Sequence, residues 1–150
     1  MLNFRLWMED NSNSFIIEKC YAALNGVKTD AGNCGQVAFA IIKYVFEKQN
    51  KYFNIGIITN AQEEKRLSEK SSIYHVYVVD NDGQRYDNFG KIDQNYLSKL
   101  AGQQYKDNNP KEFIFDLPEE LAKIQQVIEN NTNWERNWSY FYNILKQKLD

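Results

Sequence analysis

The chain has 150 residues, a formal net charge of −2 at neutral pH and a sequence pI near 5.5. That length favours one domain over residues 1–150, because single domains commonly run to about 100–200 residues, and it can bury a hydrophobic core without disulfide staples. No segment concentrates the Lys and Arg that a nucleic-acid-binding face needs, and no apolar run approaches the roughly 18 residues of a membrane span.

The N-terminal segment, MLNFRLWMEDNSNS, carries Glu9 and Asp10 where a cleavable signal peptide would place its apolar run. We therefore expect a cytoplasmic protein, or one delivered to a target cell by a route that reads no cleavable signal. Cys20 and Cys34 are too few for a disulfide framework. With the single histidine they also fall short of a tetrahedral zinc set, unless carboxylates or a second chain complete it. We expect free thiols and neither a metal nor a cofactor.

The first half of the chain predicts two helices followed by a strand. Residues 14–25 predict a short helix that ends at Gly26, a residue suited to a left-handed C-terminal cap. After a polar loop, residues 34–50 predict a helix of about four turns that is apolar on nearly every side, which is typical of a central, buried helix. Residues 52–59 are rich in β-branched and aromatic side chains and predict a buried strand.

The middle of the chain predicts a β-hairpin. The polar stretch 61–72 is expected to cross the surface, and residues 73–79 predict the next strand. The tetrapeptide Asp-Asn-Asp-Gly at 80–83 is a strong turn signal, and residues 84–89 then predict a return strand. Strands 73–79 and 84–89 should therefore pair in antiparallel fashion.

Beyond the hairpin, residues 93–101 predict a helix with Asp93 as its N-cap and Gly102 past its end. Residues 111–117 predict a further strand. Helices at the start, a sheet in the middle and helices at the end favour an α+β fold rather than a doubly wound sheet.

Two more helices are predicted at the end of the chain. Residues 118–130 predict a helix with Pro118 in its first turn, where the missing N–H costs least. Thr132-x-x-Glu135 matches a capping box for a last helix that runs through residues 137–149.

Cys34 stands where a polar loop enters the first turn of the buried helix. A helix N-terminus carries about half a positive charge and unpaired N–H groups, and cysteines so placed can have pKa values lowered from about 8.5 to roughly 3.5–7.5, especially beside a histidine. Gly32 and Gly35 flank the thiol and would let a carbonyl substrate approach, with main-chain N–H groups forming part of an oxyanion hole. The alternative is a small buried side chain, which is the interpretation we give to Cys20 in the middle of its helix.

His75 and Asp87 can meet across the predicted hairpin. A type I turn with a bulge at its glycine pairs Asp80 with Gln84, and therefore Tyr77 with Asp87. Because side chains alternate between faces with period two, His75, Tyr77 and Asp87 would share one face, and a register slip of one residue would separate them. A carboxylate beside the only imidazole of the chain would fix its tautomer and support the imidazolium. The alternatives are a structural or exposed histidine and a solvent-facing aspartate.

These segments resemble a known enzyme superfamily. Residues 33–40, Asn-Cys-Gly-Gln-Val-Ala-Phe-Ala, resemble the nucleophile segment of papain-like proteins, which include transglutaminases, arylamine N-acetyltransferases and bacterial effector deamidases. Residues 75–79 and 85–90 resemble the paired strands that carry the base and its acidic partner in those enzymes. The resemblance covers residues 30–90.

The resemblance implies a papain-like core, in which a central nucleophile-bearing helix packs on an antiparallel sheet flanked by further helices. It assigns Cys34 as nucleophile, His75 as general base and acid, and Asp87 as the residue that orients the histidine. The glutamine that the papain branch carries before its cysteine has no counterpart here, so Asn33 and Gly35 are the oxyanion or substrate candidates. The expected substrate is a protein or peptide amide.

Two functions remain open at this stage. The first is an enzyme that forms an acyl-enzyme through Cys34, as a peptidase, a glutamine deamidase or an acyltransferase. The second is an inactive relative that binds protein through its aromatic C-terminal helix, since Trp and Tyr are enriched at interface hot spots. Four aromatic or apolar residues of that helix recur at core spacing, namely Trp134, Trp138, Phe141 and Leu145, and Tyr140 and Tyr142 fall off that stripe.

Overall fold

The computed structural model describes residues 12–27, 33–68, 73–93, 95–97, 99, 109–130 and 137–150. Its helices are α2 (Ser12–Leu24), α3 (Cys34–Gln49), the 3-10 helix η1 (Glu64–Ser68), α5 (Leu121–Asn130) and α6 (Trp138–Leu149). Its strands are β1 (Asn54–Thr59), β2 (Ile73–Val79), β3 (Arg85–Asp87), β4 (Gly90–Ile92) and β5 (Lys111–Phe115). Five helices and a five-stranded antiparallel open sheet in the described residues confirm the α+β prediction.

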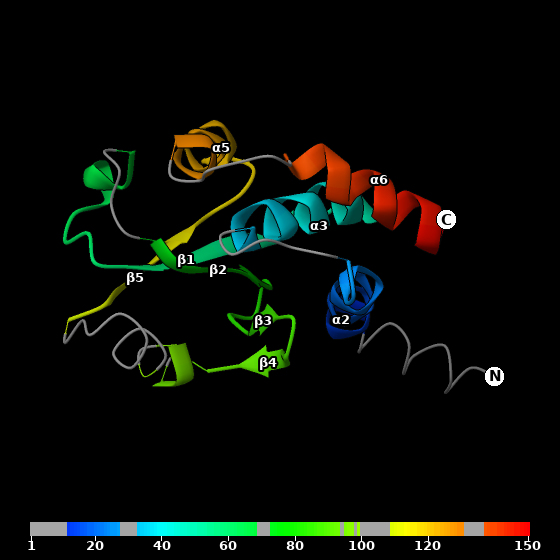
Figure 1. Cartoon of the computed structure of the whole chain (residues 1–150), viewed down its shortest axis with the longest axis horizontal. Coiled ribbons are helices and arrows are strands. Elements are labelled where there is room, and N and C mark those ends of the chain that lie inside the picture. Colours follow the sequence, from blue (N-terminus) through cyan, green and yellow to red (C-terminus); the bar gives the residue numbers. More distant parts are fainter. Residues whose placement is uncertain are drawn as a thin grey trace.

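The sheet has the strand order β4-β3-β2-β1-β5, and every neighbouring pair is antiparallel. Helix α3 lies against β1 and β2 and also contacts α2, α5 and α6, so it occupies the centre of the helical layer (Figure 1). Ten of its residues, between Gly35 and Val45, are buried. The prediction of a central helix is therefore confirmed, and its physical cause is the nearly complete ring of apolar side chains.

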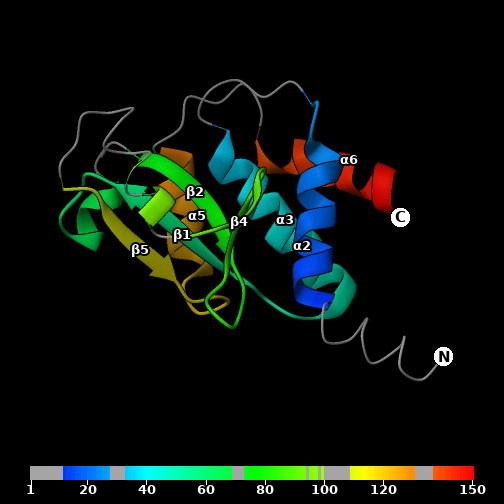
Figure 2. The same cartoon turned by 90° about the horizontal axis from the view of Figure 1, so that it is seen from below.

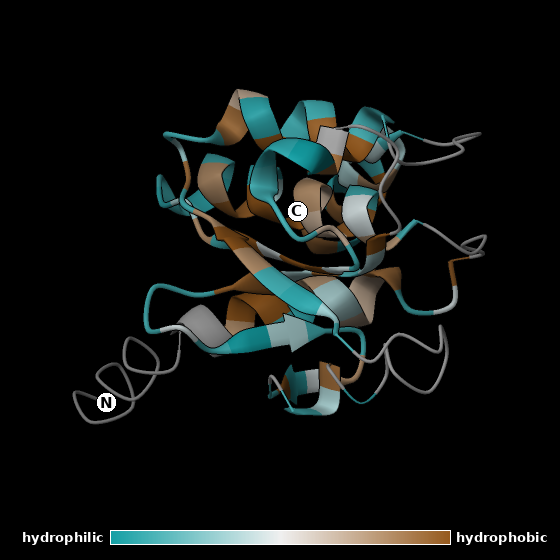
Figure 3. Ribbon diagram, turned by 90° about the vertical axis from the view of Figure 1, so that its left-hand side faces the viewer, coloured by the Kyte–Doolittle hydropathy of each residue, from teal (hydrophilic) through white to brown (hydrophobic). Residues whose placement is uncertain are grey.

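The main hydrophobic core fills the space between the helices and the sheet. In Figure 3 the hydrophobic segments gather where the helices meet the strands, and hydrophilic segments occupy outer turns. Fully buried side chains reach this core from α2, α3, β1 and α6, among them Ile17, Phe39, Ile41, Ile55 and Phe141. No helix in the described residues is both long and apolar enough to cross a membrane.

The hairpin has the register that its turn predicts. The Asp80 N–H donates to the Gln84 carbonyl at 2.9 Å, and Gly83 adopts the left-handed φ of +85° that the bulge requires. Val79 pairs with Arg85. Continuation of this register sets Asp87 opposite Tyr77, so this part of the prediction is confirmed.

The return strand is shorter than expected. The segment predicted as a strand over 84–89 ends at Asp87, and a tight turn then leads into β4, which the sequence did not predict. The Asp87 carboxylate accepts the Phe89 N–H at 2.8 Å, and Gly90 has a φ of +99° that favours glycine. These two features reverse the chain directly after Asp87.

The predicted surface stretch 61–72 contains an unpredicted 3-10 helix, η1, because Leu67 is fully buried and draws the segment onto the core. The expected cap of the 93–101 helix is confirmed, since Asp93 Oδ1 accepts the Tyr96 N–H at 2.6 Å. The predicted end of that helix, at Ala101 and Gly102, lies outside the described residues.

Helix α5 begins later than predicted, whereas α6 covers nearly all of the residues predicted for the last helix. Helix α5 begins at Leu121, so Pro118 lies in the preceding turn rather than in the first helical turn. In that turn the Leu121 N–H donates to the Pro118 carbonyl and the Glu120 N–H donates to the Asp116 carbonyl. The Glu120 carboxylate in turn accepts the Asp116 N–H. Helix α6 has Asn137 as its N-cap, whose Oδ1 accepts the Ser139 N–H at 3.1 Å. The predicted capping box at Thr132 and Glu135 lies outside the described residues.

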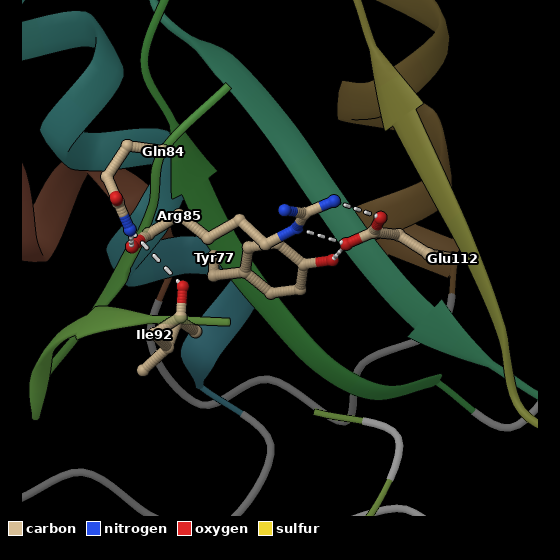
Figure 4. Close-up of polar contacts among 5 residues, drawn as sticks. All are labelled: Tyr77, Gln84, Arg85, Ile92 and Glu112. Atoms are coloured by element: carbon tan, nitrogen blue, oxygen red, sulfur yellow. Dashed lines mark hydrogen bonds and ion pairs between the residues drawn. The ribbon is translucent and has the colours of Figure 1, made fainter. Parts of the chain in front are cut away.

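A second, smaller cluster covers the other face of the sheet, and a partly buried polar network crosses it (Figure 4). Arg85 on β3 makes two hydrogen bonds to the Glu112 carboxylate on β5, at 2.7 and 2.6 Å, and the Tyr77 hydroxyl donates to the same carboxylate. The Tyr77 ring reaches Glu112 over Gly56 of β1, where a Cβ would overlap the ring. The network therefore ties β3 to the far edge of the sheet, and β3 carries Asp87.

Candidate active site

Cys34 is the first residue of α3, and its thiol is half-buried. Asn33 precedes it as the N-cap; its backbone is in the helical region, and its side chain makes no capping hydrogen bond. The first N–H groups of a helix have no partner within the helix. One of them, the Gly35 N–H, points at the Cys34 sulfur, and the Val76 N–H of β2 points at it too.

The Val76 N–H is available because β3 is short. In an antiparallel strand the N–H groups of residues two apart point to the same edge. Val78 pairs with Tyr86 of β3 on that edge, but β3 turns away after Asp87 and leaves the edge open at Val76. The N-terminus of α3 occupies this opening, so the sulfur takes the place that a strand acceptor would have filled.

His75 lies between the thiol and a carboxylate. Its Nε2 is 2.9 Å from Asp87 Oδ2, and its ring also hydrogen-bonds Cys34. Since Nε2 is engaged by Asp87, Nδ1 is the ring nitrogen left for the sulfur. A register irregularity between Ile58 and Thr59, opposite the start of β2, lies beside His75. The structure thus brings Cys34, His75 and Asp87 into one hydrogen-bonded chain.

Asp87 is held firmly in this chain. It is 3% exposed, and its two oxygens have different partners, with Oδ2 on His75 and Oδ1 accepting the Phe89 N–H. The same turn that ends β3 therefore orients the carboxylate. The sequence predicted the shared face of His75 and Asp87 from turn chemistry alone.

The charges of the three groups support one another. Burial by itself lowers the pKa of His75, but its hydrogen bonds to Asp87 and Cys34 and their charges raise it to about 9. Burial raises the pKa of the Cys34 thiol, but the hydrogen bond and charge of His75, with the Val76 and Gly35 N–H groups, bring it below its ordinary value. Cys20 is the contrast, because burial raises the pKa of that thiol to about 12.

The two oxyanion candidates, Asn33 and Gly35, flank Cys34 in the chain. Asn33 is 7% exposed and its side chain is not used as a helix cap, so it stays a candidate. Gly35 packs against neighbouring elements rather than facing open space, since a Cβ there would lie 3.5 Å from the side chains of Ile128 and Val76. The close approach at Gly35 is therefore between α3 and its neighbours, and its N–H, not its missing side chain, is the part that reaches the sulfur.

The sequence did not single out Tyr21 or Gln36. Each carries a buried side-chain oxygen without a hydrogen-bond partner in the described part of the chain, the Tyr21 hydroxyl and Gln36 Oε1. Tyr21 lies on α2, which packs against β3. No local pattern marks it, because its position beside the site depends on a contact between elements far apart in sequence.

The aromatic face of α6 mostly packs inward. Phe141 and Leu145 are buried, and Trp138 packs edge-on against Phe39 of α3 with ring centroids 5.4 Å apart. Tyr140 remains exposed, whereas Tyr142 packs on Trp138. Trp134 lies outside the described residues.

Comparison with known protein families, with curated proteins and with solved structures finds no significant match to this chain. Within the described residues, no group of three His, Cys, Asp or Glu side chains is arranged to hold a metal ion. A thiol at a helix start, hydrogen-bonded to an imidazole that a carboxylate orients, is an arrangement for nucleophilic attack.

Proposed function

We propose that the protein is a cysteine-dependent enzyme that attacks the carbonyl carbon of an amide through Cys34. The observation that carries the proposal is the continuous hydrogen-bonded chain from the Cys34 sulfur through His75 to Asp87, with the Nε2 to Oδ2 distance at 2.9 Å. Ionisable groups whose pKa values are shifted by burial and by a specific charged partner are found most often at functional sites. The lowered pKa of Cys34 and the raised pKa of His75 both favour a thiolate–imidazolium pair at neutral pH.

The reaction follows from these roles. The Cys34 thiolate forms a C–S bond to the carbonyl carbon, and the C=O electron pair moves onto oxygen. When that oxygen re-forms the double bond, the C–N bond breaks and the His75 imidazolium gives its proton to the leaving nitrogen. Water then attacks the thioester while His75 removes its proton, and the carboxylic acid and the Cys34 thiol are released. Asp87 holds the His75 tautomer through both steps.

The proposed substrate is a protein or peptide amide, and the papain-like or transglutaminase-like fold that the sequence resembles is part of the proposal. A side-chain amide of glutamine would give deamidation, a main-chain amide would give peptide hydrolysis, and an amine in place of water would give acyl transfer. All three share the acyl-enzyme on Cys34 and differ in the leaving and accepting groups.

The test first compares the alkylation of Cys34 and Cys20 and then measures turnover of an amide substrate. Iodoacetamide at about pH 6 should alkylate Cys34 quickly in the folded protein and leave Cys20 intact, as judged by peptide mass spectrometry. Protected glutamine peptides should then lose ammonia or be cleaved, with Cys34→Ala as the inactive control. The reference for an ordinary thiol is Cys20 in the denatured protein. If Cys34 in the folded protein is alkylated no faster than this reference, the proposal is wrong.

A further inference from the structure

Four tyrosines in the described residues are buried, and one of them is different. Three donate their hydroxyl groups to carboxylates: Tyr44 to Asp150, Tyr77 to Glu112 and Tyr86 to Asp80. The Tyr21 hydroxyl has no hydrogen-bond partner, although the residue is only 7% exposed. Buried tyrosine hydroxyls normally find a partner, and an exception calls for a reason such as a role in catalysis.

Tyr21 lies beside the proposed site. It belongs to α2, which packs against α3 and β3, the elements that carry Cys34 and Asp87 (Figure 2). Burial raises the pKa of Tyr21 well above its usual range, and the nearby charges of Asp87 and Cys34 raise it further. The hydroxyl therefore keeps its proton and is a neutral hydrogen-bond donor at neutral pH.

The edge of β2 relates this hydroxyl to the nucleophile. The Val76 N–H points at the Cys34 sulfur, and the N–H of Val78, which pairs with Tyr86 of β3 on the same edge, lies next to the Tyr21 oxygen. N–H groups two residues apart point to the same edge and are spaced by roughly 7 Å. The Cys34 sulfur and the Tyr21 oxygen therefore lie beside successive N–H groups of one strand edge.

We propose that Tyr21 is a further catalytic residue of the Cys34 site, whose hydroxyl donates a hydrogen bond to the substrate carbonyl oxygen as attack makes it an oxyanion. This inference rests on the proposed function and adds a residue to it. A donor that has no partner before the reaction and gains one as charge develops stabilises the transition state more than the ground state. The cost of the unpartnered hydroxyl is then part of how the site works.

The test uses two reactions of the same thiolate. With p-nitrophenyl acetate, the Cys34 thiolate forms a C–S bond, the C=O electron pair moves onto oxygen, and collapse expels p-nitrophenolate to leave S-acetyl-Cys34. With iodoacetamide, the thiolate displaces iodide from a saturated carbon, and no oxyanion forms. An oxyanion donor therefore accelerates the first reaction and not the second.

Tyr21→Phe should slow acetylation of Cys34 by about 10²–10³-fold, the usual effect of losing one oxyanion donor. Its rate of alkylation and its unfolding midpoint should not fall, because the lost hydroxyl had no partner. The matched control is Tyr44→Phe, which removes the bond to Asp150 at 2.8 Å. That variant should lose some stability and acetylate at the wild-type rate.

Two results would overturn the inference while the proposed function stands. One is a Tyr21→Phe variant that acetylates as fast as the wild type, and the other is an equal loss in both reactions. A wild-type protein whose Cys34 reacts with neither reagent would instead overturn the proposed function, and the inference with it.

Discussion

At the Cys34 sulfur, burial and hydrogen bonding act in opposite directions. Burial disfavours the thiolate, whereas the His75 hydrogen bond and charge and two backbone N–H groups favour it, and the balance lowers the thiol pKa. The His75 imidazolium is in turn supported by Asp87, which is itself held by the Phe89 N–H. Cys34, His75 and Asp87 thus each stabilise the charge on a neighbour, so the effects of single substitutions at these residues on activity should not be additive.

The pH dependence of amide turnover should reflect the pKa values of Cys34 and His75. Turnover needs the Cys34 thiolate and the His75 imidazolium together, so it should rise as pH passes the lowered pKa of Cys34 and fall as pH passes about 9. Alkylation by iodoacetamide needs only the thiolate and should show the rise without the fall. Both profiles are measurable on the same protein, and an alkylation rate that also declines above pH 9 would contradict the assignment.

Asp87→Asn should remove the charge that supports the imidazolium and keep the shape of the turn, since the amide oxygen can still accept the Phe89 N–H. The pKa of His75 should fall and that of Cys34 should rise. Amide turnover should decrease on the order of 10²–10⁴-fold. Asp93→Asn, which makes the same change of charge at the carboxylate that accepts the Tyr96 N–H, is the control. The prediction fails if the alkylation profile of Asp87→Asn stays at its wild-type pH.

At the scale of elements, the site depends on the place where β3 leaves β2. The sequence could predict the register of the two strands but not where β3 ends, because the Asp-Asn-Asp-Gly turn sets the register through local chemistry that tertiary packing did not override. The start of α3 was predictable for a similar reason, since the polar loop gives way to a continuous apolar pattern at Cys34. The edge left open at Val76 was not, because it follows from the turn that ends β3 and from the unpredicted strand β4.

Strand β1 contains a position where only glycine fits. The Tyr77 ring lies over Gly56, and a Cβ there would overlap ring atoms. Gly56→Ala should therefore destabilise the protein by about 1–3 kcal/mol, the usual cost of overpacking. Denaturant unfolding measures this, with Gly35→Ala as a stability control, because a Cβ at Gly35 meets its neighbours at an ordinary 3.5 Å. Equal losses in the two variants would show that the ring does not require Gly56.

At the scale of the whole molecule, the sheet carries different interactions on its two faces. The helical face holds the main core and α3, which begins at Cys34, and the other face holds the small cluster with its ion pair. The sequence predicted the first face from helical periodicity. It could not predict the Arg85–Glu112 pair or the place of Tyr21 against β3, because both join segments that are distant in sequence and carry no local signal.

The Arg85–Glu112 pair should be strongly coupled, since both side chains are largely removed from water, with 20% and 7% exposure (Figure 4). Glu112→Gln keeps an acceptor for Tyr77 but leaves the Arg85 charge unpaired. It should cost about 3 kcal/mol, the low end of the range for breaking a buried pair, because Arg85 keeps some contact with solvent.

The double variant Arg85→Met, Glu112→Gln removes the unpaired charge and keeps the acceptor for Tyr77, so it should recover most of that loss. Denaturant unfolding of both single variants and the double variant closes the thermodynamic cycle. A double variant no more stable than Glu112→Gln would mean that the cost came from local packing at Glu112. Recovery would instead show that the loss in Glu112→Gln came from the unpaired Arg85 charge, in a pair that spans the two intervening strands β2 and β1.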